Sequence, residues 1–535
     1  MSPVSATAIN PPAENVVADL GSSKAAVFQQ HMGHVSRHSS VFFAGTIFTA
    51  ATAYIFKVYL ARVLGAEALG IYALGMTLVG FISVFNALGL PQSAVRFVAK
   101  YCATGDMELL RGFLGRSLLL LLTSNLVFAG GLLLFGPWIS THFYHTAKLI
   151  PYVGFFAAIM FVGAFTTFFG QVLAGYKDVA RRTLITSFIG PPLTMALSAL
   201  LLSIGLGLSG YLFAQIAAAT VVLFLLFWMA WKLTPQDARL FSSGLRPIDK
   251  DVISFSAAAF GVSFLEFQMS QIDKILIGFY GNTRELGIYT VAASLVAFVP
   301  VVLQSVNQIF SPTIANLHAR GDIELLGRMF RCLTKWILGL TLPLAAVLVV
   351  FAAPLMRVFG PEFERGWPIL LVGTIGQLIN CGVGSVGYLL LMSGYQNSLV
   401  RIQTAMAIVV VILSLMLIPK WGIIGAAIAV AITNALMNLW CLAEVKRKLG
   451  LFPYNRRYLT LLLPFAITLM LLLLLRRGLA PIRPEWIAIG LGLVVAYAGF
   501  IVTALAFRLE ADDRLIAQTI WSWIFGLIRR AEVDI

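Results

Sequence analysis

The feature of this sequence that most constrains its fold is a series of apolar stretches of roughly 20 residues, closed by charged clusters or by glycine and proline. A helix of that length crosses a hydrocarbon core about 30 Å thick. With 59% hydrophobic and 11% charged residues, the chain is too apolar to bury these stretches in a soluble fold. The sequence therefore predicts an all-α polytopic membrane protein with fourteen transmembrane helices. The predicted spans are 41–62, 69–90, 114–136, 149–172, 183–205, 209–231, 252–278, 286–310, 333–353, 368–391, 402–419, 422–443, 458–475 and 486–507.

The first twelve spans form two copies of one pattern. LGIYALGMTLVGF at 69–81 returns as LGIYTVAASLVAF at 286–298, an offset of 217 residues, and Lys57 falls on Lys274 at the same offset. The GDMELL and GDIELL blocks have an offset of 216, and the AGYKD and SGYQN blocks an offset of 219. This predicts two six-helix lobes as parallel repeats, which in many transporters place the substrate path on a pseudo-two-fold axis.

The domain organisation follows from the repeat and from composition. The first segment is rich in Ala, Ser, Pro and Asn and lacks the apolar core of a signal peptide. The last segment has apolar residues at helical spacing opposite polar ones, which is typical of a helix on the membrane surface. The predicted segments are a flexible cytoplasmic N-terminal tail at 1–40, an N-lobe at 41–231, a cytoplasmic linker at 232–251, a C-lobe at 252–443, two extra spans at 444–507 and a cytoplasmic amphipathic helix at 508–535.

The distribution of Lys and Arg predicts the orientation. Of the 38 basic residues, 27 lie on the side of both termini, 10 lie on the other side, and Lys57 lies within a span. By the positive-inside rule both termini are cytoplasmic. The same rule explains the net charge of +15, so nucleic acid is not an expected partner.

Few ionisable residues lie within the predicted spans, and each costs roughly 3 kcal/mol at the membrane centre. They are Lys57 in the first span and, in the seventh, a stripe of Ser263, Glu266, Ser270 and Asp273 with Lys274 beside it. The two lysines either snorkel to the outer interface or mark an aqueous cavity that binds phosphate or sugar acid groups. Glu266 lies deeper, which favours a cavity or proton-coupling role over an internal salt bridge.

Neutral polar residues and basic loop residues supply further candidates. Asn and Gln within spans commonly join helices, whereas basic residues beside the spans either follow the positive-inside rule or bind a headgroup at the cytoplasmic mouth. The candidates for the substrate cavity or coupling are Lys57, Glu266, Ser270, Asp273, Lys274, Gln304 and Asn307. The candidates for the headgroup are Arg96, Lys177, Arg181 and Arg182.

Prolines within spans predict bends, because they free backbone carbonyls and interrupt the helix. Such prolines pack helices or permit a lobe to rock, and Pro300 in the eighth span is the strongest candidate for a bend that moves.

Signatures of enzymes and metal sites are missing from the sequence. There is no GxxxxGK loop, no HExxH and no large outer loop with paired carboxylates. Cys381 and Cys441 lie in apolar runs, and Cys102 and Cys332 lie in predicted cytoplasmic loops, so no disulfide framework or metal spacing appears. The sequence predicts a protein that is not an enzyme and that needs no cofactor or metal.

Four segments resemble the oligosaccharide flippases of the multidrug, oligosaccharidyl-lipid and polysaccharide exporter superfamily. They are LARVLGAEALGIYALG, GLPQSAVRFVAKYCATGD, QIDKILIGFYGNTRELGIY and IFSPTIANLHARGDIELL. The resemblance covers nearly the whole chain and implies a central cavity lined by spans one, two, seven and eight. It implies alternating access that moves an undecaprenyl-linked O-antigen or exopolysaccharide repeat unit outward across the bacterial inner membrane. Expected partners are this lipid-linked glycan, membrane lipids, and polysaccharide polymerase and assembly proteins.

Several alternatives remain open on the sequence. Lipid II flippases share fourteen spans but usually gather arginines within the first-lobe cavity, and spans one and two contain none before Arg62 and Arg96. Drug antiporters of the superfamily tend to use an acid in span one, and residues 41–61 contain none. A membrane polysaccharide polymerase or ligase would also be multispan and basic, but the short outer loops argue against it. A non-transporting scaffold would not require the polar stripes.

Overall fold

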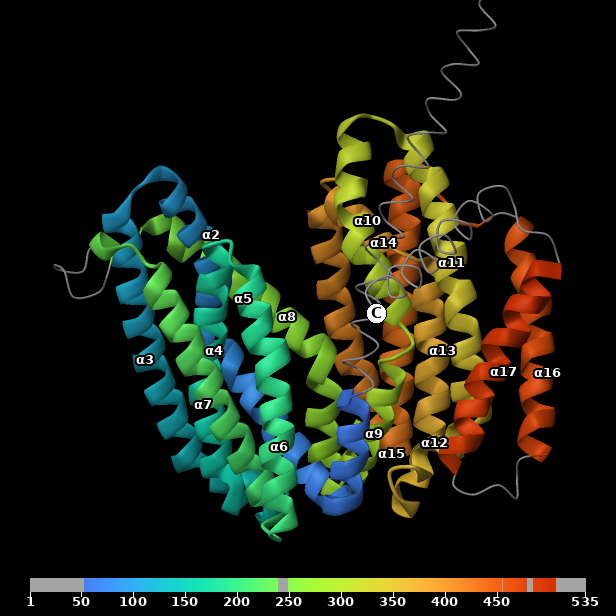
Figure 1. Cartoon of the computed structure of the whole chain (residues 1–535), viewed down its shortest axis with the longest axis horizontal. Coiled ribbons are helices and arrows are strands. Elements are labelled where there is room, and N and C mark those ends of the chain that lie inside the picture. The colour runs from blue at the N-terminus through green and yellow to red at the C-terminus, as the bar shows by residue number, and fades with distance from the viewer. Residues whose placement is uncertain (1–51, 239–248, 455, 479–484, 507–535) are drawn as a thin grey trace, which may run out of the picture.

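The computed structural model describes residues 52–238, 249–454, 456–478 and 485–506. These residues form two helical bundles that converge at one end and separate at the other (Figure 1). The predicted tail at 1–40 and the amphipathic helix at 508–535 lie outside the described residues.

The first bundle contains one unlabelled helix and six labelled helices joined by short turns. The helices are 52–87, α2 (Leu90–Thr104), α3 (Met107–Trp138), α4 (Val153–Gly175), α5 (Val179–Thr183), α6 (Gly190–Ser203) and α7 (Gly207–Leu233). Short segments of π-helix, η1 (Ile139–Phe143) and η3 (Leu184–Ile189), and of 3-10 helix, η2 (Ala147–Tyr152) and η4 (Gln236–Ala238), lie between or beside them.

The second bundle follows in the same order and adds two helices at its far side. The helices are α8 (Lys250–Tyr280), α9 (Thr283–Val296), α10 (Val301–Ala319), α11 (Ile323–Val350), α12 (Ala352–Arg357), α13 (Trp367–Val383), α14 (Val386–Met392), α15 (Gln396–Leu449), α16 (Leu462–Gly478) and α17 (Glu485–Ala506), with short turns η5 (Pro361–Gly366) and η6 (Arg456–Leu461). The α8 helix packs against both α15 of this bundle and α2 of the first.

The helices are compatible with the fourteen predicted spans. Ten described helices are long and apolar enough to cross a membrane, or eleven when the bent pair of α9 and α10 is one span. Two of the ten contain a glycine that divides them, Gly65 with φ +77° in the helix 52–87 and Gly422 with φ +55° in α15. The α16 helix adds a further apolar segment of 17 residues.

The second span of each bundle is broken, and both breaks were partly visible in the sequence. The α9 and α10 helices meet at an angle of 52° next to Pro300, which confirms the predicted bend there. In the first bundle the helix stops at residue 87, and α2 restarts after Leu88 and Gly89 with Pro91 in its first turn. Arg96 and Cys102 therefore lie on a helix rather than in the predicted loop, and Cys332 is likewise buried within α11.

The bundles meet where the two LGIY helices cross. A Cβ on Gly70 would lie 1.6 Å from the carbonyl oxygen of Thr283, and a Cβ on Gly287 would lie 1.9 Å from that of Ala66. Both pairs are related by the repeat offset of 217 residues. Only residues without a side chain allow this approach of two backbones, and the reciprocal contact is what a pseudo-two-fold axis produces.

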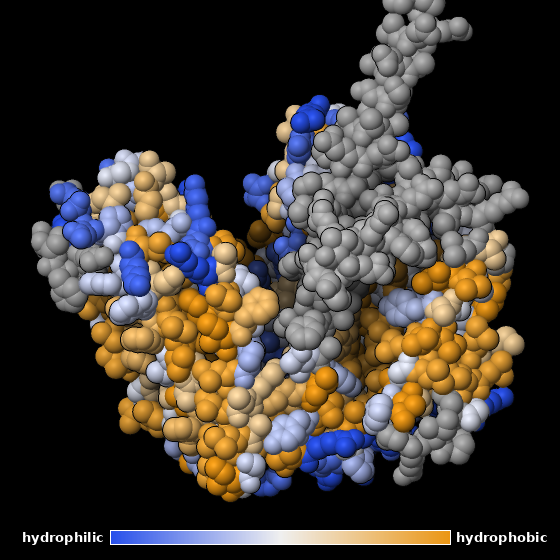
Figure 2. Space-filling model, viewed as in Figure 1, coloured by the Kyte–Doolittle hydropathy of each residue, from blue (hydrophilic) through white to orange (hydrophobic). Residues whose placement is uncertain are grey.

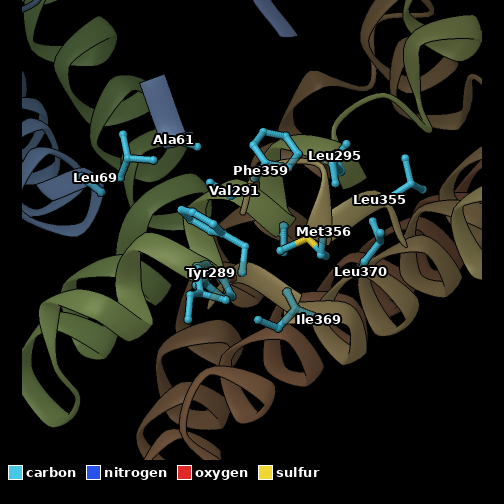
Figure 3. Packing of buried hydrophobic residues seen from close by; sticks show 14 of the residues in the cluster. Ala61, Leu69, Tyr289, Val291, Leu295, Leu355, Met356, Phe359, Ile369 and Leu370 are labelled. Carbon is cyan, nitrogen blue, oxygen red and sulfur yellow. The ribbon is translucent and has the colours of Figure 1, made fainter. Parts of the chain in front are cut away.

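A hydrophobic core lies at the same converging end. One cluster of buried side chains takes members from both bundles. Figure 3 shows Ala61 and Leu69 of the first bundle beside Val291 and Phe359 of the second. We call this the closed end, and the opposite end, where the bundles separate, the open end.

A hollow between the bundles faces the open end (Figure 2). Hydrophilic residues line its walls there, whereas the outer sides of the bundles are largely hydrophobic, as a surface against lipid must be. The open end holds the loops richest in Lys and Arg, which the positive-inside rule predicts to be cytoplasmic.

Candidate substrate cavity

Lys57 and Lys274 lie at equivalent depths in the two bundles, eight residues before Gly65 and Asn282. They are near enough for each charge to act on the other. Lys57 precedes Gly65 by eight residues, so at 1.5 Å per residue it lies roughly 12 Å inside the closed end. Because these lysines are equivalent in the repeat, a site that both of them reach would lie on the pseudo-two-fold axis, just inside the crossing of the LGIY helices.

The direction of Lys274 argues against snorkelling. Its Nζ donates to Oε1 of Gln271, at 2.7 Å, and Gln271 lies three residues earlier in α8. A side chain on a helix leans toward the N-terminus of that helix, and the N-terminus of α8 is at the open end. The ammonium therefore points along the hollow and away from the outer interface that snorkelling would seek.

Glu266 and Ser270 are both exposed on α8. Two apolar pockets of about 450 and 410 Å³ flank α8 and take Ala257, Gln268 and Ile272 from its opposite side. Residues two apart on a helix point about 200° apart, so Glu266 and Ser270 turn away from these pockets. The alternative interpretation of Glu266, an internal salt bridge, has no counterpart among the described residues, and Thr49, its equivalent in the repeat, lies outside them.

Two predicted cavity residues are buried in packing instead. Asp273, only 7% exposed, accepts a hydrogen bond from the Tyr289 hydroxyl, which joins α8 to α9. Asn307 is equally buried on the core side of α10. Neither side chain reaches the wall of the hollow, because a polar stripe read along a helix does not show which part of it a neighbouring helix covers.

The polar side chains of α10 that do reach the surface are amides. Gln304, a predicted candidate, is exposed, and so are Gln308 and Asn316, which sequence analysis did not single out. The buried face of α10 lies on its other side, and α10 borders the gap between the bundles (Figure 1). The spacing of four residues between Gln304 and Gln308 was the signal in the sequence.

The predicted headgroup residues lie toward the open end in two groups. Arg96 on α2 stacks over the Phe255 ring of α8, with its guanidinium carbon 4.6 Å from the ring centroid. Arg182 donates to Gln171 at 3.2 Å, and Arg181 pairs with Asp178 at 3.0 Å. Lys177 has a left-handed φ of +63°. Arg96 thus contacts α8, whereas Arg181 and Arg182 bind partners within the first bundle.

The repeated LGIY motif supplies functional residues that the sequence analysis missed. Its glycines make the helix crossing, and its tyrosines bind polar partners within each bundle. Tyr289 donates to Asp273, whereas Tyr72 accepts from Gln215 of α7 at 2.8 Å. The sequence signal for these residues was that LGIY is identical in both copies of the repeat.

Comparison with known proteins identifies the family. The sequence model of the family described as polysaccharide biosynthesis protein matches residues 35–318, more than half of the chain. The chain belongs to this family. The MatE family model matches residues 258–423, within the second bundle.

Proteins similar to this polysaccharide biosynthesis family member include two flippases, one described as probable. The probable flippase AglR of Haloferax volcanii is 25% identical over 190 residues, which cover 34% of this chain and 39% of AglR, so the match spans about two fifths of that relative. The lipid II flippase MurJ, in an inward closed conformation, has the same fold with a TM-score of 0.68 and 15% identity over 87% of this chain and 98% of MurJ.

A multidrug resistance MATE family transporter of the MOP superfamily, in an inward-facing conformation, gives a TM-score of 0.62 with 15% identity. That match covers 75% of this chain and 94% of the transporter. The chain thus belongs to the polysaccharide biosynthesis family and has the fold of the exporter superfamily, in agreement with the resemblance seen in the sequence.

Proposed function

We propose that the protein moves a polyprenyl-pyrophosphate-linked oligosaccharide from the cytoplasmic to the outer leaflet by alternating access. The observation that carries the proposal is the pair of equivalent lysines, Lys57 and Lys274, one from each bundle and near enough for their charges to interact. Two ammonium groups close to each other repel, and a multivalent anion between them would relieve that repulsion. A pyrophosphate bears such charge, and lysine binds phosphate as a point charge.

The shape of the hollow suits a lipid-linked sugar. A charged, hydroxylated headgroup cannot enter hydrocarbon, while its polyprenyl chain cannot leave it. A hollow that is polar inside and apolar outside separates these two parts. Exposed amides such as Gln304 and Gln308 on its wall can exchange hydrogen bonds with sugar hydroxyls. The cytoplasmic orientation, the bacterial inner membrane and polymerase or assembly partners belong to the same proposal.

Glu266 is proposed as the coupling group of this transport. It is an exposed acid on the wall of the hollow, with Ser270 one turn away, and it can exchange a proton or bind a cation there. The alternatives are lipid II, whose pyrophosphate the lysines would serve equally, and a cationic drug, which they would repel.

Purified protein in proteoliposomes tests the proposal. The measured quantity is the rate at which a fluorescent undecaprenyl-pyrophosphate-linked oligosaccharide changes leaflet. Replacing Lys57 and Lys274 by Gln should slow it about tenfold per lysine, because a hydrogen bond to a charged group contributes about 1.5 kcal/mol or more. Lys420→Gln is the control, since that lysine is exposed in the predicted outer loop between spans eleven and twelve.

The outcomes separate the candidate functions. Lipid II moving faster than the oligosaccharide would favour the lipid II reading, and uptake of a cationic dye would favour the antiporter. If the double lysine variant moves the oligosaccharide at the rate of Lys420→Gln, the anion site between the lysines is wrong.

A further inference from the structure

We infer that Glu362 is a latch that holds the closed end of the hollow shut. Its Oε1 accepts a hydrogen bond from the backbone N–H of Ala66, at 2.7 Å, and its Oε2 pairs with Arg284, at 3.0 Å. Ala66 begins the LGIY helix of the first bundle, and Arg284 lies in the first turn of α9 in the second. One half-buried carboxylate thus binds both bundles.

The backbone at Gly65 explains why a carboxylate fits there. Its φ of +77° ends one helix and starts the next, so the first N–H groups of the new helix have no carbonyl partner within it. A negative charge at a helix N-terminus is also favoured by the helix dipole. Glu362 belongs to η5 in the other bundle, so the group that satisfies this N-terminus comes from across the interface between the bundles. We call this interface at the closed end the seam.

Neighbouring contacts cross the seam at the same place. Nε of Arg62 donates to the carbonyl oxygen of Val358 at 2.8 Å. The Tyr54 ring meets that of Phe359 edge-on, with centroids 5.3 Å apart. The turn that carries Glu362 is therefore seated on the end of the first span of the other bundle.

The equivalent contact in the other half is aromatic rather than polar. The repeat offset carries Arg62 onto Phe279, and the Phe279 ring packs against Phe143 at 5.0 Å and His145 at 5.9 Å. Each bundle thus places its outer turn on the end of the first span of the other. The closed end has one polar half and one aromatic half.

The charges of the two halves are reversed. Glu67 pairs with Lys148 within the first bundle, and the repeat offset carries Glu67 onto Arg284, which pairs with Glu362. The acidic partner of the ion pair is Glu67, on the helix, in the first bundle, and Glu362, on η5, in the second. Only an acid on the turn can accept from the helix N–H groups of the other bundle, so the latch exists in one half of the seam among the described residues.

This role rests on the alternating access proposed above, but it does not depend on which substrate is transported. Alternating access requires the closed end to open, which must break the bond between Glu362 and Ala66. Arg284 keeps the carboxylate in its own bundle when the seam parts. Glu362 therefore shifts the equilibrium between the closed and the opened seam toward the closed state.

The distance across the seam in lipid nanodiscs tests the latch without any substrate. Spin labels replace Ala147 in the first bundle and Arg365 in the second, both exposed, after the four cysteines have been replaced by Ser. Glu362→Ala should raise the ratio of open to closed seam about tenfold, since it removes a charge-assisted hydrogen bond. Glu362→Gln should have a smaller effect, because its amide oxygen still accepts from Ala66.

Glu364→Ala is the matched control. Glu364 lies on the same turn but pairs with Arg357 of its own bundle, at 3.8 Å, so its loss should leave the distance distribution unchanged. Equal distributions for Glu362→Ala and Glu364→Ala would overturn the latch. Should Glu362→Ala fail to fold, Glu362→Leu and Glu364→Leu, which remove the same acceptors but keep the bulk of the side chain, replace the two Ala variants in this comparison.

Discussion

The crossing of the two LGIY helices predicts that Gly287→Ala forces the closed end apart. The new Cβ would lie 1.9 Å from the carbonyl oxygen of Ala66, whereas ordinary contact begins at 3.4 Å. The helices must separate by about 1.5 Å at this point, and the obstacle is backbone, which cannot rotate away. Overpacking of this kind costs about 1–3 kcal/mol, and the upper value corresponds to a population shift of about 100-fold.

The assay is the distance between Ala147 and Arg365 across the seam, with thermal unfolding as a check that the variant is folded. Gly261→Ala on α8 is the control, since no atom lies within 4 Å of the Cβ it would add. Gly70→Ala should match Gly287→Ala because the repeat makes their contacts reciprocal. The double variant should cost less than the sum of the two, since the first change already parts the helices.

The reasoning fails if Gly287→Ala and Gly261→Ala give the same distances and the same unfolding temperature. It also fails if the two reciprocal variants differ widely. Such results would mean that the backbones do not approach as closely as the repeat requires.

Three further predictions follow from the cavity and the topology. Glu266→Gln should reach the membrane at the normal level yet lose gradient-driven export, whereas Glu324→Gln at the open end should keep it. Normal export by Glu266→Gln under every imposed ion gradient would show that Glu266 has no coupling role. Asp273→Ala should lower the free energy of unfolding by about 1–3 kcal/mol, because it leaves the buried Tyr289 hydroxyl without its acceptor. Transport per folded molecule should stay normal. A loss of transport without a loss of stability would mean that Asp273 acts in the cavity after all. A C-terminal alkaline phosphatase fusion should be inactive, since both termini are predicted to be cytoplasmic, and an active fusion would refute that orientation.

Much of the fold is predictable from sequence because a membrane helix is a local property. About 20 apolar residues define it whatever its neighbours are, so the spans are visible without any contact being known. The bend at Pro300 is local too, because the ring removes a donor and clashes with the preceding turn. The missed helix α2 is the exception: its basic and polar residues resemble a loop, but it packs against α4.

The candidate site was predictable only in part. Lys57 and Lys274 were paired by the repeat, and Glu266 was placed on a polar stripe, yet the same stripe also contained Asp273. Asp273 is covered by Tyr289 while Glu266 is exposed. Helical spacing gives the direction of a side chain relative to its own helix, and only the neighbouring helix decides whether that direction leads to water or to packing.

By itself the sequence determined the membrane spans, the two-fold repeat and the pairs of equivalent residues, because hydropathy and repetition are written along the chain. The tertiary structure alone decided which equivalent pairs meet. Gly70 and Gly287 touch because the LGIY helices cross at the pseudo-two-fold axis. Glu362 reaches Ala66 because a turn almost 300 residues away is seated on that helix end. Contacts between distant segments depend on the relative position of the two bundles, and no local pattern of residues fixes that position.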